Sequence, residues 1–300
     1  MERRSAPEDD NVTVGRAAGR VSRRCRLSFG RVSVAVLLLL LAFSWVWVVT
    51  EERARGSALV SAESVEHVGR FLRDLVGWGA ARPPAYLRPE RWGAMAGLAL
   101  ETLAMSILAA GIAGGGAVLL ALFAARNVAF GALRPSSSLI WPLAYLLARG
   151  AFAVTRALPE LVWALLLLFL FLPGLLPGAL ALGLHNLGVV GKLSAEAVEN
   201  VQVRPLQALQ RSGARPGQVL AYGVLPALLP QLLTYLCYRW EVIIRSTMIV
   251  GFVGAGGLGY EFRLRMSYFH YTEVTLILLV YLLLVVGVDL ISAGLRRLAR

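Results

Sequence analysis

The chain has little charge. Of its 300 residues, 16% are Asp, Glu, Lys or Arg, whereas about 25% is usual for a soluble domain. So few charged side chains cannot cover a globular surface, and 57% of the residues are hydrophobic. The composition argues against an ordinary soluble domain and favours a membrane protein.

Residues that form disulfides or bind metals are also scarce. The two cysteines, Cys25 and Cys237, lie far apart, and the three histidines, His67, His185 and His270, are scattered. Neither the cysteines nor the histidines have the spacing of a disulfide framework or a metal site. We therefore expect no metal and no cofactor.

Lysine is almost absent, since Lys192 is the single one and every other basic residue is arginine. The net charge of +12 would suit nucleic acid, but the arginines lie in short segments between apolar runs. This distribution is typical of the cytoplasmic bias of membrane proteins. We expect a lipid bilayer and no nucleic acid as partner. Arg263, Arg265 and the arginines of residues 53–91 are exceptions, because they fall on the outer side.

Long apolar runs predict an all-α, polytopic membrane protein with six transmembrane helices. Each run approaches the roughly 20 residues needed to cross a bilayer. The predicted spans are 32–50, 94–125, 159–178, 180–201, 225–250 and 272–293. Residues 139–157 carry two arginines and are predicted as an amphipathic helix at the interface. Both termini are placed in the cytoplasm, together with most arginine clusters.

The N-terminal 93 residues divide into three parts. Residues 1–31 are Arg-rich and without apolar period, which predicts a disordered cytoplasmic tail. A basic segment before an apolar run also describes a secretory signal peptide. However, the run at 32–50 contains Trp45 and Trp47 and lacks a small-residue cleavage site, which favours a retained first helix. Residues 51–93 are predicted as an outer loop with one surface helix.

The stretch VGAGGLGYEF fits GxGxxG, a pattern that binds dinucleotides only within a strand–turn–helix unit. No alternation of strands and helices surrounds it. Gly254, Gly256, Gly257 and Gly259 instead predict a tight turn with positive φ and close backbone packing after a membrane helix. Irregular backbone at membrane depth requires a cover of protein or a water-filled cavity. The turn is therefore a candidate for the transport pathway or its gate, or a plain reversal.

The segment from Arg204 to Pro226 is polar. Pro205 suits the first position of a helix, and Gly213 suits a left-handed cap. Between them a helix of about two turns would place Leu206 and Leu209 on one side. So short a helix is not stable alone, so it must dock on its own protein or in the cleft of a partner.

This spacing resembles the EAA motif of ABC importer permeases. The matching positions are Gln207, Ala208, Leu209, Gly213, Gly223, Leu225 and Pro226. Gln207 stands where the family has Glu, and Gly223 where it has Ile. Further blocks resemble the phosphonate/phosphite permease branch, which usually has Asn where this chain has Ile243. These blocks are RALPELVWAL, LHNLGVVGKLSAEAVE, YGVLP, YRWEVIIRS and GFVGAGGLGYEF.

The resemblance covers about residues 95–295 and implies a permease core over 94–300, with an EAA-type coupling segment at 203–226. It implies a multi-pass protein of the bacterial inner membrane that imports phosphonate or phosphite anions and is not an enzyme. The implied partners are an ATP-binding subunit, a second permease copy and an extracytoplasmic binding protein. The coupling residues would be Leu206, Gln207, Ala208, Leu209, Gly213, Leu225 and Pro226.

The chain has no GxxxxGK[ST] phosphate loop of its own, so it cannot use ATP alone. Two alternatives remain open. One is an ABC permease for another solute, such as phosphate, methionine, a metal or an osmolyte. The other is a secondary transporter or a membrane enzyme.

Polar residues inside the predicted spans are candidates for function, because they are costly in lipid. Glu241 and Arg245 are four apart, the spacing of a helical ion pair, with Arg239 nearby. An arginine here could meet a phosphonate through its forked donors, or Glu241 and Arg245 could simply neutralise each other. His185 and Asn186 are either a hydrogen-bonded helix contact or part of the pathway. The remaining position, Pro159, is predicted to open the third span.

Overall fold

The computed structural model describes residues 29–54, 62–79, 83–131, 133 and 138–298. The predicted tail therefore lies outside the described residues, apart from its last three positions. The chain divides into two compact units, one up to His67 and one from Val68 onward. Each unit is described by itself.

The first unit contains helix α1, Phe29–Ala54. Its 26 residues extend about 39 Å, which exceeds the roughly 30 Å of a hydrocarbon core. Its side chains between Val32 and Val46 are exposed within this unit. A helix that is apolar on all sides suits lipid, and this agrees with the predicted first span.

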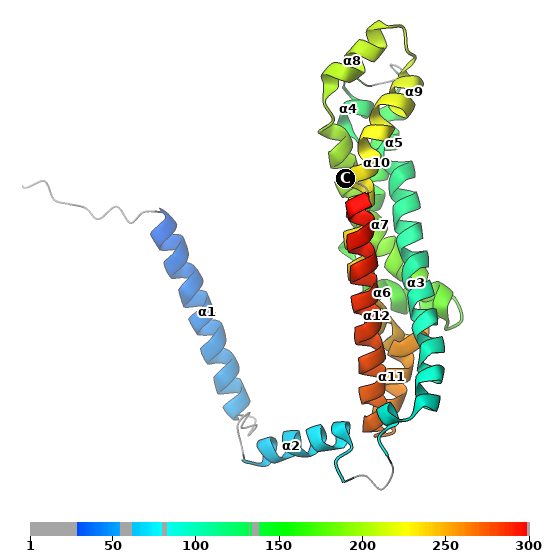
Figure 1. Ribbon diagram of the computed structural model, residues 1–300. Coiled ribbons are helices and arrows are strands. Elements are labelled where there is room, and N and C mark those ends of the chain that lie inside the picture. The colour runs from blue at the N-terminus through cyan, green and yellow to red at the C-terminus, as the bar shows by residue number, and fades with distance from the viewer. Residues whose placement is uncertain (1–28, 55–61, 80–82, 132, 134–137, 299–300) are drawn as a thin grey trace, which may run out of the picture. The chain divides into compact units, whose positions relative to one another are not determined.

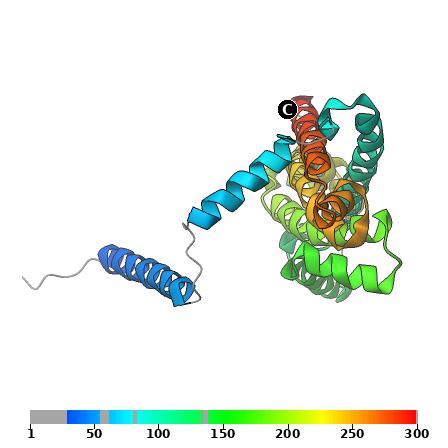
Figure 2. The same ribbon diagram turned by 90° about the horizontal axis from the view of Figure 1, so that it is seen from below.

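The second unit is a helical bundle (Figures 1 and 2). No strand occurs in the described parts of the chain. Its long helices are α3 (Pro89–Ala121), α5 (Ile140–Ala157), α6 (Glu160–Leu170), α7 (Leu175–Glu199), α10 (Leu225–Val250) and α12 (Tyr271–Leu298). Helix α2 (Ala62–Val76) crosses the boundary, and only its residues from Val68 onward belong to this unit. The other shorter elements are η1 (Ala85–Leu87), α4 (Arg126–Ala129), α8 (Val203–Arg211), α9 (Pro216–Val219), η2 (Leu220–Val224), η3 (Gly251–Ala255) and α11 (Gly257–Ser267).

Helices α3 and α7 form the most extensive contact of the bundle. Their approach depends on glycine. A Cβ atom on Gly116 would lie 2.6 Å from a methyl of Leu187, and one on Gly183 would lie 2.9 Å from Ile112. Small residues allow membrane helices to pack this closely. The glycine-rich stretch of the second predicted span therefore has a packing role.

The third predicted span, 159–178, is wrong as a continuous helix. Helix α6 ends at Leu170 after 11 residues, about 16 Å of helix. Pro173 and Gly174 then interrupt the chain, and α7 begins at Leu175. The axes of α5 and α6 differ by 95°. The PGLLPG stretch at 173–178 was predicted to end the span, but the helix already ends at Leu170, and α7 begins within that stretch.

The prediction of six spans is not confirmed. Among the described residues, four helices are long and apolar enough to cross a membrane, or five if the bent pair α5–α6 counts as one. The four cover 32–51, 89–129, 216–255 and 271–298. Helix α7 has 25 residues but carries His185, Asn186 and Lys192, which make it more polar.

The elements of interest lie at opposite ends of the bundle. Helices α8 and α9 occupy one end, and the C-terminal half of α12 runs toward that end without reaching it (Figure 1). Helix α11, η1 and the N-terminal ends of α3 and α12 occupy the other end (Figures 1 and 2). Helix α10 and helix α11 both pack against α12, whereas η3, which forms the turn between them, contacts α6 and α7.

Candidate functional site

The predicted polar helix is present as α8. It ends at Arg211, and Gly213 has a φ of +88°, the left-handed conformation expected of a glycine cap. Pro205 is the third helical residue, not the first as predicted. This is tolerated because the first-turn N–H groups have no partner within a helix.

One side of α8 docks on its own chain. Leu206 is buried in a cluster with Val219, Val224 and Leu228, and the partly buried Leu209 packs against that cluster. Leu206 and Leu209 therefore dock α8 on its own protein and not in the cleft of a partner. Their contact holds α8 against the start of α10.

The other side of α8 is exposed. Arg204, Gln207, Ala208 and Arg211 are all accessible. Gln207 and Ala208 occupy two of the predicted coupling positions. The surface that α8 offers to another protein is thus polar and basic, and Leu206 does not belong to it.

The end of the predicted coupling segment forms the start of α10. Leu225 is half-buried and is the first residue of that helix, and the exposed Pro226 follows it. The start of α10 follows directly on the π-turn η2, in which the Leu225 N–H donates to the Leu220 carbonyl oxygen, so Pro226 falls where the regular α-helical bonding is already interrupted. These two residues fix the direction in which α10 leaves the α8 end.

The glycine stretch forms the turn between α10 and α11. Gly254, Gly256 and Gly257 have φ values of +116°, +86° and +65°, so the prediction of positive φ is confirmed for these three. Gly259 is required for another reason, because a Cβ atom there would lie 2.3 Å from the carbonyl oxygen of Met248. No strand precedes this turn in the described residues, which removes the context that a dinucleotide site needs.

The turn is fastened to α3. The backbone N–H of Leu258 donates to Thr102 Oγ1 at 2.9 Å. A Cβ atom on Gly257 would lie 2.6 Å from the same hydroxyl oxygen. The turn can therefore move only if its contact with α3 changes.

The charged residues of α10 pair with α12. Arg245 Nη2 lies 2.9 and 2.8 Å from the two carboxylate oxygens of Asp289, and Glu241 forms an ion pair with Arg296. The expected neutralisation of Glu241 by Arg245 is therefore wrong, although Arg245 Nη1 donates to the Glu241 carbonyl oxygen at 2.8 Å. We call these four residues the charged seam.

The seam is partly open on the outside of the unit. The side chains of Arg245 and Asp289 are 48% and 39% exposed. Charged groups are costly against lipid, so this face requires water or another protein beside it. Sequence analysis missed Asp289, although an acid inside the last predicted span was a usable signal.

Arg239, His185 and Asn186 form separate contacts. Arg239 donates to Asn186 Oδ1 from Nε at 2.9 Å and from Nη2 at 2.6 Å. The buried Asn186 donates to the Leu182 carbonyl oxygen at 2.7 Å. His185 Nδ1 lies 2.9 Å from the Leu158 carbonyl oxygen. His185 and Asn186 are thus both hydrogen-bonded helix contacts, but they have different partners.

Pro159 immediately precedes α6 and caps it, one position before the predicted N1 site. Its φ of −56° and ψ of 148° are extended, so the chain leaves α5 and turns there. Glu160 begins α6 and accepts a short hydrogen bond from Ser246 of α10. This contact ties the start of α6 to the helix that carries the seam.

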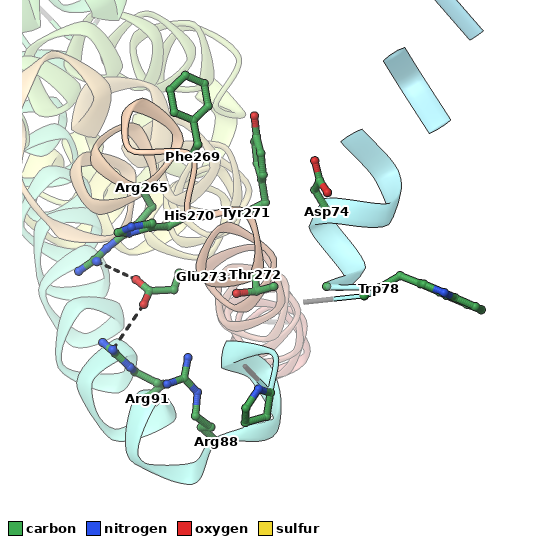
Figure 3. Close-up of a pocket in the computed structure, with 13 residues that line it drawn as sticks. Asp74, Trp78, Arg88, Arg91, Arg265, Phe269, His270, Tyr271, Thr272 and Glu273 are labelled. Atoms are coloured by element: carbon green, nitrogen blue, oxygen red, sulfur yellow. Dashed lines mark ion pairs between the residues drawn. The ribbon is translucent and has the colours of Figure 1, made fainter. Parts of the chain in front are cut away.

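A pocket of about 660 Å³ lies at the end opposite α8. Figure 3 shows that its walls carry Arg88, Arg91, Arg265, Glu273 and Asp74. Sequence analysis did not predict this pocket. The outer-side arginines that break the charge bias were the available signal.

Several apolar helices long enough to cross a membrane, with a short polar helix docked at one end, describe a polytopic membrane protein. Residues 117–299 match the family model of the binding-protein-dependent transport system inner membrane component. The chain therefore belongs to this family and is a transport subunit.

Curated relatives and solved structures agree with this family. The chain is 40% identical to the phosphite transport system permease protein PtxC of Stutzerimonas stutzeri, over 73% of this chain and 75% of that protein. It is 33% identical to the phosphate-import permease protein PhnE of Mycolicibacterium smegmatis, over 72% of this chain and 38% of that protein. The inward-facing MetNI methionine ABC transporter shares the fold, with a TM-score of 0.59 and 17% identity over 69% of this chain and 96% of that chain.

Proposed function

We propose that this chain is the membrane subunit of an ATP-driven importer that carries phosphite or phosphonate anions across the bacterial inner membrane. The observation that carries the proposal is its 40% identity to a phosphite transport permease over three quarters of that protein. The chain would work with a separate ATP-binding subunit and with an extracytoplasmic binding protein, and the family description supports the second of these partners.

The exposed side of α8 supports a contact with the ATP-binding subunit. Gln207 and Ala208 are accessible while Leu206 holds the helix to its own chain. A movement of the ATP-binding subunit would then pass through α8 to the start of α10. We infer that this end of the bundle faces the cytoplasm, in keeping with its arginines, and that both chain termini are cytoplasmic.

The charged seam supports a second permease copy. A half-exposed ion pair within transmembrane helices needs protein or water beside it, and a pore between two copies would supply both. Arg245 would present its guanidinium to the passing anion, and the glycine turn would lie next to the gate. The substrate would be selected mainly by the binding protein.

Phosphate is the second candidate substrate, because a relative at 33% identity is a phosphate-import permease. Phosphate and phosphite share the tetrahedral oxyanion geometry that arginine recognises. The two candidates therefore differ in the binding protein more than in this chain.

Purification of the binding protein encoded beside this gene tests the substrate. Its affinity is measured for phosphite, methylphosphonate, aminoethylphosphonate, phosphate, methionine and glycine betaine. The assembled transporter in proteoliposomes is then tested for uptake of the best ligand with and without ATP. Tight binding of phosphite or a phosphonate with ATP-dependent uptake supports the proposal. Selective binding of methionine or betaine overturns the substrate, and uptake without ATP overturns the ATP-driven importer.

A further inference from the structure

The pocket at the end opposite α8 has no assigned role. Its walls come from the end of α2, the segment before α3, the first turn of α3, the end of α11 and the start of α12 (Figure 3). If α8 faces the cytoplasm, the pocket faces the side from which substrate arrives. The family match begins at residue 117. The pocket residues Asp74, Arg88 and Arg91 precede it, so they lie outside the matched family core.

One buried carboxylate organises the arginines. Glu273 is 9% exposed. Arg265 lies 2.7 Å from one of its oxygens and Arg91 lies 3.5 Å from the other. Arg265 is also 2.5 Å from Glu261. Arg265 is therefore held by two carboxylates, and Arg91 shares one of them at longer range.

Arg88 is the cation left over. Its guanidinium makes no hydrogen bond or ion pair with any described residue, and its Nε is buried. A buried charged donor without an acceptor is destabilising. Figure 3 shows the Arg88 and Arg91 side chains on the same wall, below Glu273. An anion at this wall would give Arg88 its missing acceptor and Arg91 a closer one.

The charged groups of the pocket are unevenly placed. The lining contains three arginines and two carboxylates, those of Glu273 and Asp74, together with His270. Asp74 belongs to α2, and Figure 3 shows it on a different wall from Arg88. The positive charge is thus concentrated at the start of α3.

We propose that Arg88 and Arg91 bind a tetrahedral phosphorus oxyanion in this pocket, before it enters the membrane pathway. Paired guanidinium groups recognise such oxyanions because each can donate two parallel hydrogen bonds. The pocket exceeds the size of one such ion, so water fills the rest. The choice of oxyanion rests on the proposed function. A lipid headgroup phosphate has the same chemistry and must be separated by experiment.

The test uses the permease assembled with its ATP-binding subunit in phosphatidylcholine nanodiscs, without the binding protein. Binding of [14C]methylphosphonate is measured, with unlabelled phosphite as competitor. We expect saturable binding that Arg88→Gln and Arg91→Gln each weaken by roughly tenfold to a hundredfold. Arg88→Lys should retain part of the affinity, because the charge remains without the fork.

Arg263→Gln is the matched control. Arg263 lies in α11, as the pocket residue Arg265 does. Its guanidinium lies over the Tyr260 ring, 5.3 Å from the centroid, and does not line the pocket. This variant should bind methylphosphonate as the wild type does. All variants must copurify with the ATP-binding subunit, so that a folding defect is not mistaken for a lost contact.

Three results would overturn the site. The first is absence of saturable binding, or equal affinity in the Arg88 and Arg91 variants. The second is loss of a copurifying anionic lipid in Arg88→Gln, with phosphatidylglycerol displacing the probe from the wild type. The third, measured in a separate pull-down with the binding protein added, is loss of binding-protein docking in Arg88→Gln at unchanged probe affinity. Uptake by the wild type separates the two proposals, because ATP-driven phosphonate uptake with a failed pocket test leaves the proposed function intact.

Discussion

Leu206 occupies the space that a Cβ atom on Gly223 would need. Such an atom would lie 2.6 Å from Leu206 Cδ2. The position of α8 is therefore set by the packing of the Leu206 side chain against Gly223, which has no side chain. In the motif that this segment resembles, Ile stands at the position of Gly223. In this chain, Leu206 packs into the space that the larger side chain would need. The contact joins the exposed face of α8 to the start of α10.

Gly223→Val should displace Leu206 and tilt α8. Overpacking of this kind costs about 1–3 kcal/mol. We expect ATP-driven uptake to fall at least tenfold and copurification of the ATP-binding subunit to weaken, while the permease still inserts. Uptake in proteoliposomes and quantitative pull-down measure the two effects.

Gly217→Val is the control for this substitution, because a Cβ atom on Gly217 meets nothing within 4 Å. It should leave uptake nearly unchanged. Adding Leu206→Ala to Gly223→Val should restore part of the uptake by freeing space. Full uptake by Gly223→Val alone would show that this contact does not position α8.

Gly256→Val should block transport without releasing the ATP-binding subunit. Gly256 has φ +86° and ψ −163°, a conformation that is essentially restricted to glycine and costs other residues about 1–3 kcal/mol. The turn lies far from α8 (Figure 1), so docking should persist. Gly115→Val in α3 is the control, because its Cβ would meet open space. Normal uptake by Gly256→Val would exclude a role for the turn in the pathway.

The elements predicted from sequence are those that local chemistry determines. Pro205 lies in the first turn of α8 and Gly213 follows its end, because proline fits a first turn and glycine fits a left-handed cap. Gly254, Gly256 and Gly257 predict positive φ, because glycine adopts this conformation without steric cost. Such signals depend on the residue and its near neighbours, so sequence contains them. The identity of the partner that α8 meets is not among them.

Contacts between distant segments were not predictable in this way. Arg245 has an acid four residues away and nevertheless pairs with Asp289, 44 residues further on. The pocket unites Asp74 with Glu273, and no sequence period connects them. The break at PGLLPG was predicted, but the early end of α6 at Leu170 was not, because hydrophobic composition reports burial in lipid and not the direction of the chain.

The pair Arg245–Asp289 can be tested by exchange. Arg245→Ala leaves Asp289 unpaired in a membrane helix, where an uncompensated charge costs about 2.5–3.5 kcal/mol. We expect it to abolish uptake while assembly survives. Exchange of the two residues, Arg245→Asp with Asp289→Arg, should restore the melting temperature. If uptake also returns, the pair is structural; if uptake stays lost, the place of the guanidinium matters and the pathway role is supported.

Asn186 offers a final separation between structure and transport. Its Oδ1 accepts both donors from Arg239, so Asn186→Leu should leave a partly buried guanidinium unsatisfied. The loss is about 1–3 kcal/mol, a fall in melting temperature of roughly 2–10 °C. Asn186→Asp should keep the contact and strengthen it by charge. The exposed Asn200→Leu at the end of the same helix should change little.

Uptake by these variants decides what Arg239 does. If the contact only holds α7 to α10, uptake should follow the melting temperature, and Asn186→Asp should transport like the wild type. If Arg239 attracts the anion, the added carboxylate should cancel its charge, so Asn186→Asp should be stable and inactive. A stable, fully active Asn186→Asp would therefore show that Arg239 does not attract the anion. Arg245 would then remain as the candidate cation of the transport pathway.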